Sequence, residues 1–531
     1  MVKKWGLILL LWLPIAPVAL VVYYLNQYSG IDFFLRLLVS LILIFSYLSI
    51  IAIGSYFIKR QKKKGIFATS LISIFCLVGS LYFAYINIRI YHTLNQMIRT
   101  QSEVNQSLVS MTLSEINALH DLDGHLVGVL NLSDERVAEG INQFLIETKL
   151  LESNTVKTYD SPVMMVHALY NGEIDAMIID SNFAMIFSEN GGFEEIETET
   201  QILETITIVT ENILTNNSDI ANEPFTILLL GTNSTEEGNI HLGQVNTLIL
   251  TTINLQNLSV TMTSIPRDSF VTIPCFNYTN DKLSHSHAGG TTCVVQTVEH
   301  LFDIDIPYYA TLNFRGMVSL VDTIGGIEVD VPITFSEQNS RRQFGNHMIT
   351  VYEGRQRLDG EQALALARHR NTLRLGDLAR ASHQQLVLEG IVNEILHGGT
   401  TVNDMLALLN VLGENLDTNL SLNEMTAIAQ ALLDLVPVIT NSQSLDEVHI
   451  KNMVLSGESG WAQTMHYSFP LSVLFPFEGA IEDAKELILI NLEEIEPPFN
   501  FEFYFNGFEG SWTTNWVQPI YNEPSRNQVI R

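Results

Sequence analysis

A set of basic residues stands out in a chain of 531 residues whose formal net charge is −30. A guanidinium is a rigid, permanently charged fork that binds phosphate oxygens in pairs. Several of them gathered in one pocket would bind a pyrophosphate and stabilise the charge that develops on its leaving oxygen. The candidates for this chemistry, together with one amide that follows the last arginine, are Arg267, Lys282, Arg368, Arg370, Arg380 and Gln384.

The spacing of these residues leaves two interpretations open. Asp377, Arg380 and Gln384 follow at i, i+3 and i+7, so they share one face of a helix. Arg368 and Arg370 share a face only if the chain is extended between them. The alternative to a phosphate site is a set of surface salt bridges with the many acidic residues. Spacing alone does not decide between them, because a sequence does not show which side chains converge.

The elements that would position these residues form an α/β pattern beginning at Phe225. Apolar β runs alternate with segments of helical periodicity. Beyond residue 400 we expect further helices to about Leu435, followed by an irregular, aromatic C-terminal part. The expected strands are Phe225–Leu230, Thr247–Ile253, Leu258–Ser264 and Glu328–Val331, and the expected helices are Thr292–Phe302, Phe314–Thr323, Glu361–Ala367 and Leu378–Leu396.

A smaller α/β pattern precedes this one, after an expected helical stalk over residues 90–120. Its strands are expected at 126–130, 156–159 and 175–179, with helices at 134–147 and 161–171. The polar stretch 215–224 suits a linker to the larger domain. The small domain loosely resembles half of a periplasmic solute-binding protein, which would imply a small ligand. No motif within it supports a ligand, which favours a protein-contact or spacer role.

Three apolar segments open the chain, at Trp5–Tyr24, Phe33–Ile58 and Ile66–Ile88. Each approaches the roughly 20 residues that a membrane-spanning helix needs. A cleaved signal peptide is the alternative for the first segment, but its two prolines and the lack of a small-residue cleavage site favour a retained span. The basic run 59–64 stays in the cytoplasm by the positive-inside rule. We therefore predict a three-pass membrane protein with a cytoplasmic N-terminus and everything after about Arg89 outside the cell.

Composition and cysteine placement narrow the possibilities further. An acidic chain lacks the basic footprint of a nucleic-acid-binding protein, so nucleic acid is excluded as a partner. Cys275 and Cys293 lie in the exterior part, where disulfides persist, and we predict a bridge between them. A metal site with His285 and His287 is the alternative, although no CxxC or HExxH pattern accompanies them.

The region 225–396 resembles the LytR-CpsA-Psr family. The resemblance is carried by the order and spacing of several short motifs, each weak alone and specific in combination. Three spans and an α/β module before the main domain also resemble the capsule-type streptococcal members and their accessory domain. The motifs are Ile227–Gly231 (ILLLG), Ser264–Ser269 (SIPRDS), Asp281–Leu283 (DKL) with Gly289 and Gly290, Leu320–Val329 (LVDTIGGIEV), Leu358–Leu364 (LDGEQAL) running into Ala367–Arg370 (ARHR), and Gly376–Arg380 (GDLAR) with Gln384.

The resemblance implies an enzyme that transfers a glycan, such as teichoic acid or capsule, from a polyprenyl-pyrophosphate carrier to a peptidoglycan hydroxyl by phosphoryl transfer. It also implies pyrophosphate binding by the basic residues named above and by Gln384, with Lys282 acting as a point charge. Arg267, Arg370 and Asp377 become the catalytic candidates. Asp377 would orient or deprotonate the acceptor hydroxyl, and the alternative role for its side chain is a helix N-cap.

The sequence departs from the family pattern where a metal should bind. Asn233 and Asn246 stand where the family has aspartates, and Gln244 stands where it has an arginine. Magnesium favours carboxylates and phosphate oxygens, so a Mg²⁺ ion would depend mainly on the substrate phosphates. The protein would bind metal weakly, work without it, or have lost catalysis. If catalysis has been lost, the alternative is that the protein is a silent family member, which binds lipid-linked glycans or regulates envelope assembly.

The predicted fold class is therefore α/β. It comprises an N-terminal three-helix membrane region, a small α/β accessory domain, and a larger α/β/α domain with a mixed central sheet. The predicted boundaries are 1–90 for the membrane helices, 91–220 for the stalk and accessory domain, 221–400 for the catalytic domain, and 401–531 for its helical and irregular extension. The predicted partners are a polyprenyl-pyrophosphate-linked glycan, peptidoglycan and the membrane.

Overall fold

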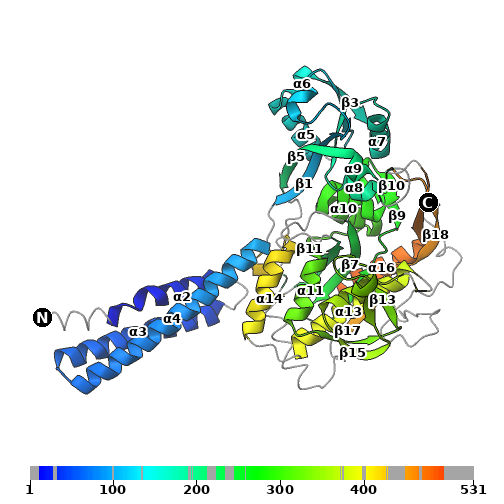
Figure 1. Ribbon diagram of the computed structural model, residues 1–531. Helices are drawn as coiled ribbons and strands as arrows, with labels where there is room; N and C mark the ends of the chain where they lie inside the picture. Colours follow the sequence, from blue (N-terminus) through cyan, green and yellow to red (C-terminus); the bar gives the residue numbers. More distant parts are fainter. Residues whose placement is uncertain are drawn as a thin grey trace.

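The computed structural model is a mixed α/β protein with three parts, an N-terminal helical bundle, a small α/β unit and a larger α/β domain (Figure 1). The predicted irregular C-terminus beyond residue 495 and residues 215–219 and 221–222 of the predicted linker lie outside the described residues. The structure describes residues 11–27, 33–97, 101–132, 135–188, 193, 195–211, 220, 223–233, 244–256, 259–370, 372–373, 376–397, 402–421, 423–425, 427–428, 449–465 and 469–495.

Three helices form the N-terminal bundle, namely α2 (Ile15–Gln27), α3 (Phe33–Lys59) and α4 (Lys63–Met97). Two of them are long and apolar enough to cross a membrane, over Arg36–Lys59 and Lys63–Leu94, while the apolar part of α2 is shorter. Large apolar side chains such as Phe34 and Phe75 face outward, as expected for a surface in lipid. Two membrane helices are thus plausible by length and composition, and the third span and the topology remain predictions.

The small unit contains a five-stranded sheet in the order β3-β2-β4-β1-β5. The strands β2, β3 and β4 run parallel, and β1 pairs antiparallel with β4 and β5. Its elements are β1 (Gln101–Met111), β2 (Leu126–Leu130), α5 (Glu135–Glu147), α6 (Leu150–Ser153), β3 (Thr155–Tyr159), α7 (Pro162–Tyr170), β4 (Ala176–Asp180), α8 (Phe183–Ser188), α9 (Ile196–Glu199) and β5 (Thr200–Glu211).

The predicted helical stalk over residues 90–120 is wrong beyond Met97. Residues 101–111 form β1, the strand between β4 and β5, with Leu108 and Val109 completely buried. Pairing on both edges supplies the backbone hydrogen bonds that a helix would otherwise make, so tertiary context overrides the weak helical signal. The small unit is therefore joined to α4 by a very short connection.

The larger domain is built on a six-stranded mixed sheet in the order β16-β11-β6-β7-β8-β17. The parallel pairs are β11 with β6 and β17 with β8, and the other neighbours are antiparallel. It follows that β6, β8, β11 and β17 all point in one direction. The strands are β6 (Phe225–Thr232), β7 (Val245–Asn254), β8 (Ser259–Ser264), β11 (Tyr308–Asn313), β16 (Leu416–Thr418) and β17 (His449–Val454).

Helices cover both faces of this sheet. On one face α10 (Gly290–Phe302) and α16 (Glu478–Asn491) pack against Leu228 and Leu250 in a dry core. On the other face lie α11 (Phe314–Thr323), α12 (Gly360–Arg368), α13 (Asp377–His397) and α14 (Val402–Asn415). Short hairpins complete the domain, formed by β9 (Phe270–Ile273) with β10 (Thr279–Lys282), β12 (Ile327–Val331) with β15 (Gly354–Leu358), β13 (Phe335–Glu337) with β14 (Ile349–Val351), and β18 (Gly457–Ala462) with β19 (Leu471–Pro476).

The C-terminal part is more regular than predicted. Residues 449–454 form the edge strand β17 of the main sheet, and residues 478–491 form α16 beneath it. The expectation of an irregular segment is therefore wrong for the described part of residues 449–495. Met453 and Leu455 are completely buried and Leu487 nearly so, which shows that this segment completes the core of the domain.

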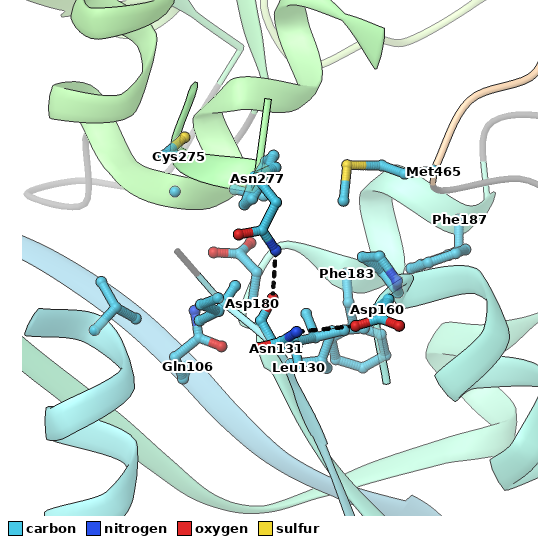
Figure 2. A pocket seen from close by; sticks show the side chains of 17 residues that line it. Gln106, Leu130, Asn131, Asp160, Asp180, Phe183, Phe187, Cys275, Asn277 and Met465 are labelled. Carbon is cyan, nitrogen blue, oxygen red and sulfur yellow. Dashed lines mark hydrogen bonds between the residues drawn. The ribbon is translucent and has the colours of Figure 1, made fainter. Parts of the chain in front are cut away.

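The small unit and the larger domain contact each other through a few specific residues (Figure 2). Met465 accepts hydrogen bonds at its backbone carbonyl from Ser161 Oγ at 2.6 Å and from Val163 N at 3.4 Å. Asn277 Nδ2 donates to the backbone carbonyl of Asn131 at 3.1 Å. The two units therefore form a continuous body rather than being joined only by their linker.

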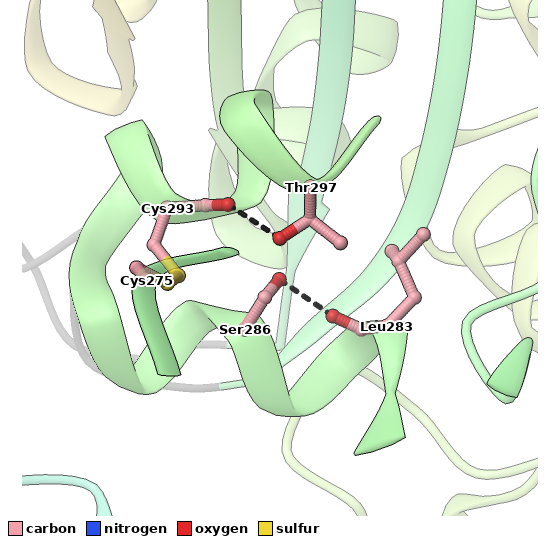
Figure 3. The surroundings of a disulfide bond; sticks show 5 residues. All are labelled: Cys275, Leu283, Ser286, Cys293 and Thr297. Carbon is pink, nitrogen blue, oxygen red and sulfur yellow. Dashed lines mark hydrogen bonds between the residues drawn. A yellow bond between two sulfur atoms is a disulfide. The ribbon is translucent and has the colours of Figure 1, made fainter. Parts of the chain in front are cut away.

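The predicted disulfide between Cys275 and Cys293 is present, next to this contact (Figure 3). It joins the short 3₁₀ helix Pro274–Phe276 to the first turn of α10, and both cysteines are buried. The alternative prediction was a metal site that includes His285 and His287. It has no support, because His285 Nδ1 pairs with the buried Asp281 carboxylate at 2.8 Å and no metal-binding cluster occurs among the described residues.

Candidate anion-binding cavity

A cavity of about 460 Å³ lies between the main sheet and helices α11 to α14. Its polar end lies where the parallel strands β6, β8 and β11 end and the antiparallel strand β7 begins. Ligands of open α/β sheets bind at this carboxyl edge. The strands therefore deliver Asn233, Asn246, Arg267 and Asn313 to one place, although these residues lie up to 80 positions apart in the chain.

Arg267 enters the cavity from the loop that follows β8. One Nη of its guanidinium donates a hydrogen bond to Asn246 Oδ1. Its Nε is buried and has no hydrogen-bond partner among the described residues. A buried donor without a partner is costly, so this guanidinium is prepared for an acceptor that the protein itself does not supply.

Arg368 and Arg370 reach the same cavity from the end of α12. The helix begins with a capping box at Asp359 and Gln362 and ends at Arg368. The next residue, His369, has extended backbone angles, which is the condition under which both arginines can face one side. Arg368 lies over the ring of Phe314, with 5.0 Å from the guanidinium carbon to the ring centroid. Burial lowers the pKa of Arg368.

Helix α13 contributes Arg380 and Gln384. Arg380 is only 7% exposed, and its Nη2 lies 2.5 Å from Asp377 Oδ1. Burial lowers the pKa of Arg380 to about 10; Asp377 opposes this shift, and the positive charges of Arg267 and Arg370 add to it. Arg267, Arg370 and Arg380 line the same cavity and therefore repel one another, and a bound anion would relieve this repulsion.

Asp377 differs from the N-cap role predicted for it. It is the first residue of α13, so the N-cap position falls on Gly376, whose carbonyl accepts a hydrogen bond from Arg380 N. Its side chain pairs with Arg380, and Asp377 is not among the residues that line the cavity. The carboxylate therefore holds the Arg380 guanidinium in place, and its predicted role towards the acceptor hydroxyl stays a prediction.

Lys282 also lies apart from the cavity. Its Nζ is 3.0 Å from Asp268 Oδ1. Burial alone would raise the pKa of Asp268, but the charges of Lys282, Arg267 and Arg380 together hold it below its ordinary value. An ionised Asp268 thus neutralises Lys282 and steadies the loop that carries Arg267, which makes Lys282 a supporting residue rather than a phosphate ligand.

The residues proposed as a degenerate metal site do not fit a Mg²⁺ ion. Asn233 Oδ1 accepts from the backbone N–H of Gln244 at 2.8 Å, and Asn246 Oδ1 accepts from Arg267. Each oxygen already accepts one hydrogen bond, and neither carries the negative charge that the ion favours. The one carboxylate that lines the cavity in the described part of the chain is Glu337.

Sequence reasoning missed Glu337, Arg342 and Phe314, which also line the cavity. Burial alone would raise the pKa of Glu337, but hydrogen bonds from His369 and the backbone of Gln338, with the charge of Arg368, hold it below its ordinary value. The pair Arg341-Arg342 in an acidic chain was a signal for Arg342. No pattern distinguished Glu337 from the other acidic residues, because its position depends on how the β13 hairpin packs.

The rest of the cavity wall is apolar. Side chains of the sheet face those of α11, α13 and α14 across the space. One end of the cavity is therefore strongly cationic and the other is suited to hydrocarbon. The apolar lining comprises Leu229, Leu230, Ile249, Ala310, Leu312, Met317, Leu320, Leu364, Ala367, Val387, Leu388, Ile391, Leu412 and Leu416.

The fold and the cavity together place a cluster of arginines and an apolar lining at the carboxyl edge of a mixed sheet, an arrangement complementary to an amphipathic molecule with an anionic head. Comparison of the sequence with protein-family models identifies the family. A model of the LytR_cpsA_psr family matches residues 194–469, about half of the chain, and the chain belongs to this family. The match begins before the region that carried the resemblance and ends beyond it.

Two relatives are polyisoprenyl-teichoic acid–peptidoglycan teichoic acid transferases named TagU. The protein of Enterococcus faecalis is 36% identical over 208 residues, which cover 39% of this chain and 65% of the relative. That of Bacillus subtilis is 34% identical over 206 residues, covering 38% and 62%. The chain thus spans slightly less than two thirds of their length. A crystal structure from Streptococcus agalactiae, at 26% identity, covers 52% of this chain and 92% of that one with a TM-score of 0.43.

Proposed function

We propose that the protein transfers a glycan from a polyprenyl-pyrophosphate carrier to a hydroxyl of peptidoglycan. The observation that carries this proposal is the convergence of Arg267, Arg368, Arg370 and Arg380 at one end of a cavity whose other walls are apolar. A diphosphate attached to a hydrocarbon chain has the same two parts in the same order. The relatives' names supply the donor class and the acceptor.

In the proposed reaction the acceptor hydroxyl oxygen attacks the phosphorus on the glycan side of the diphosphate. A new phosphorus–oxygen bond forms to the acceptor, and the bond from that phosphorus to the bridging oxygen breaks. The lipid phosphate leaves with the bonding electron pair, and the hydroxyl proton passes to a nearby base. Fixed guanidinium groups stabilise the charge that accumulates on the phosphate oxygens.

Glu337 is a better candidate than Asp377 for orienting the acceptor hydroxyl. Its carboxylate lines the cavity and is held ionised next to Arg368, whereas Asp377 is paired with Arg380. An ionised carboxylate accepts a hydrogen bond from a hydroxyl and can receive its proton in the transition state. We assign Arg267, Arg370 and Arg380 to the head group and Glu337 to the acceptor.

The apolar part of the cavity lies beside the helical bundle. Leu412 and Leu416 line the cavity, and the helix that ends between them, α14, packs directly against the membrane-proximal end of α4. Gly413 faces Thr93 at this contact. A hydrocarbon chain could pass from the membrane along α4 to the cavity without crossing open water. This arrangement supports a carrier that keeps its tail in the bilayer during transfer.

The topology completes the proposal. We propose that α2, α3 and α4 are three membrane spans, that the N-terminus is cytoplasmic, and that the accessory unit and the larger domain lie outside the cell. The support is the basic loop around Lys62 between α3 and α4 and the predicted retention of the first segment. The proposal covers glycans such as teichoic acid and capsule as donors and a hydroxyl of peptidoglycan as the acceptor.

A transfer assay tests the proposal. Full-length protein in detergent is incubated with a polyprenyl-pyrophosphate disaccharide and peptidoglycan oligomers, with and without EDTA, and the coupled product is measured by mass spectrometry. We expect product in both conditions, since the described residues of the cavity offer magnesium a single carboxylate, Glu337. Absence of product, with the donor still bound, would favour the second candidate.

That second candidate is a family member that binds the lipid-linked glycan without transferring it. One observation favours it, namely that Asn233 and Asn246 stand where the family pattern has acidic residues and that their side-chain oxygens are already engaged. Retention of the arginines is compatible with both candidates, because binding and transfer need the same head-group contacts.

A further inference from the structure

A second, much smaller cavity of about 40 Å³ lies where the accessory unit meets the larger domain (Figure 2). The three parallel strands of the accessory sheet end here. Leu130 and Asn131 follow from β2, Asp160 from β3, and Asp180 is the last residue of β4. This is again the carboxyl edge of parallel strands, the place where open α/β sheets bind ligands.

Two buried polar side chains line this cavity from neighbouring strands. Asp180 and Gln106 are direct partners across the β4–β1 ladder, so their side chains lie on the same face. Asp180 is 9% exposed and Gln106 4%. The side-chain amide of Gln106 lines the cavity beside the Asp180 carboxylate, so the two together offer hydrogen-bond acceptors to a polar guest.

The charge in the cavity is entirely negative. Among the described residues that line it there is no Lys, Arg or His, whereas both Asp160 and Asp180 are present. Asp180 accepts a hydrogen bond from the backbone N–H of Asn182 at 2.8 Å, and no ion pair within the described chain neutralises it. Burial raises the pKa of Asp180 to about 7. A bound cation would favour the ionised form and would lower that cost.

The remaining walls are apolar and aromatic, and the larger domain closes the space. Phe183 and Phe187 of α8 and Pro162 of α7 form one side. Cys275, Asn277 and Met465 face them from the larger domain, as Figure 2 shows. The disulfide and the Asn277–Asn131 hydrogen bond fix this cover in position. Aromatic faces beside carboxylates attract organic cations.

We propose that this cavity binds a primary ammonium group, held by Asp180 and Gln106 and enclosed by Phe183 and Met465. A cavity needs roughly 10–15 Å³ for each water-sized group, so this one has room for about three. That is the size of a short alkylammonium or of the amine end of a larger molecule. A hard divalent cation is disfavoured, because it would need six or more oxygen ligands.

The proposal stands independently of the transfer reaction, since none of these residues lines the arginine cavity. A ligand here would nevertheless contact both units at once. Met465 N donates to Asp281 Oδ2 at 3.2 Å, and Asp281 directly precedes Lys282, the partner of Asp268. A bound amine would therefore steady the accessory unit against the domain that carries the arginines.

Ethylammonium chloride is a suitable probe, with sodium chloride at equal ionic strength as the reference. Hydrogen exchange of peptides covering 126–131 and 176–188 is measured on the full-length protein in detergent. We expect ethylammonium at about ten times its Kd to slow exchange there about tenfold. Asp180→Asn should abolish this protection, and Gln106→Ala should weaken it. The control Glu173→Gln makes the same charge change at an exposed position away from the cavity and should leave the protection unchanged.

Three outcomes would overturn the proposal. One is equal exchange in ethylammonium and sodium chloride. Another is full protection of the Asp180→Asn variant by ethylammonium. The third is protection by calcium chloride and not by ethylammonium, which would make the cavity a metal site. Because asparagine has nearly the size of aspartate, exchange of Asp180→Asn in sodium chloride that is no faster than exchange of the wild type would verify that the variant is folded.

Discussion

The two cavities of this protein share a backbone geometry and differ in charge. Each lies at the carboxyl edge of parallel strands, one on the six-stranded sheet and one on the accessory sheet. The first collects Arg267, Arg370 and Arg380, and the second collects Asp160 and Asp180, with no basic residue among the described part of its lining. Strand ends thus provide a place for a ligand, while the side chains that follow them decide its charge.

The cavities also differ in what encloses them. Helices of the same domain cover the arginine cavity, and its apolar walls continue towards the membrane-proximal contact of α14 with α4. The acidic cavity is closed by a different unit, through Asn277 and Met465. The larger cavity can therefore work with the accessory unit displaced, whereas the smaller one exists only while the two units remain in contact.

Removal of one guanidinium should have the largest effect. We expect Arg267→Ala to lower the transfer rate about 10²–10³-fold, because a donor aimed at developing charge contributes about 3–4 kcal/mol to transition-state stabilisation. The rate is measured in the coupled-product assay. Arg355→Ala removes an exposed guanidinium from the same domain and should change the rate less than twofold. Equal rates for both variants would show that the cavity is not the reaction site.

The two regions should respond to pH with opposite sign. In the larger domain, burial lowers the pKa of His383 to about 4, so its contribution to stability is present above its ordinary pKa and is lost as pH falls towards 4. In the accessory unit, burial raises the pKa of Asp180 to about 7, so its contribution is present at low pH and is lost as pH rises through 7. Each effect is on the order of 3 kcal/mol.

Denaturant unfolding of the wild type and two variants at about pH 5 and pH 7 measures these contributions. His383→Gln should reduce the loss of stability on acidification, whereas Asp180→Asn should make the protein more stable at the higher pH. Burial favours the neutral form of both side chains, so variants that both changed the pH dependence in the same direction would contradict this assignment.

Glu337 should have a smaller effect than the arginines. We expect Glu337→Gln to lower the transfer rate about tenfold, because general-base catalysis is lost. Donor binding should be unchanged, because the contacts to the head group remain. Asp377→Asn should instead weaken donor binding by loosening Arg380. A reversal of these two patterns would restore Asp377 as the group that faces the acceptor.

The contact between α14 and α4 offers a mild test of the proposed lipid route. A Cβ atom at Gly413 would lie 2.6 Å from Thr93 Cγ2, so Gly413→Val must separate the helices slightly. We expect about a threefold rise in KM for a long-chain donor and no change for a short-chain donor. Because overpacking of this kind typically costs about 1–3 kcal/mol, the fold should survive. Equal effects on both donors would argue against this route.

The strands that lead into both cavities could be predicted from sequence. The apolar runs at 225–230 and 126–130 agree with β6 and β2, and the glycines after residue 324 agree with the end of α11. The convergence of the arginines could not be predicted, because it depends on sheet order. Arg267 and Arg380 meet only because β8 is a central strand with α13 packed on it.

The errors have physical causes of the same kind. Residues 101–111 and 449–454 become strands because each finds a pairing partner far away in the chain. The spacing of Asp377 and Arg380 predicts a shared helix face, but it does not show that the two side chains pair with each other. Glu337 was missed because only the packing of a hairpin against His369 brings it to the cavity.

The central claim is that the arginines and the apolar walls of one cavity act on one molecule. It is tested most directly by calorimetric binding of farnesyl pyrophosphate, farnesol and inorganic pyrophosphate to the full-length protein. We predict that farnesyl pyrophosphate binds at least about 100-fold more tightly than either part, and that the double variant Arg267→Ala, Arg380→Ala loses this advantage. Equal affinity for farnesol and farnesyl pyrophosphate, unchanged in the double variant, would contradict the claim.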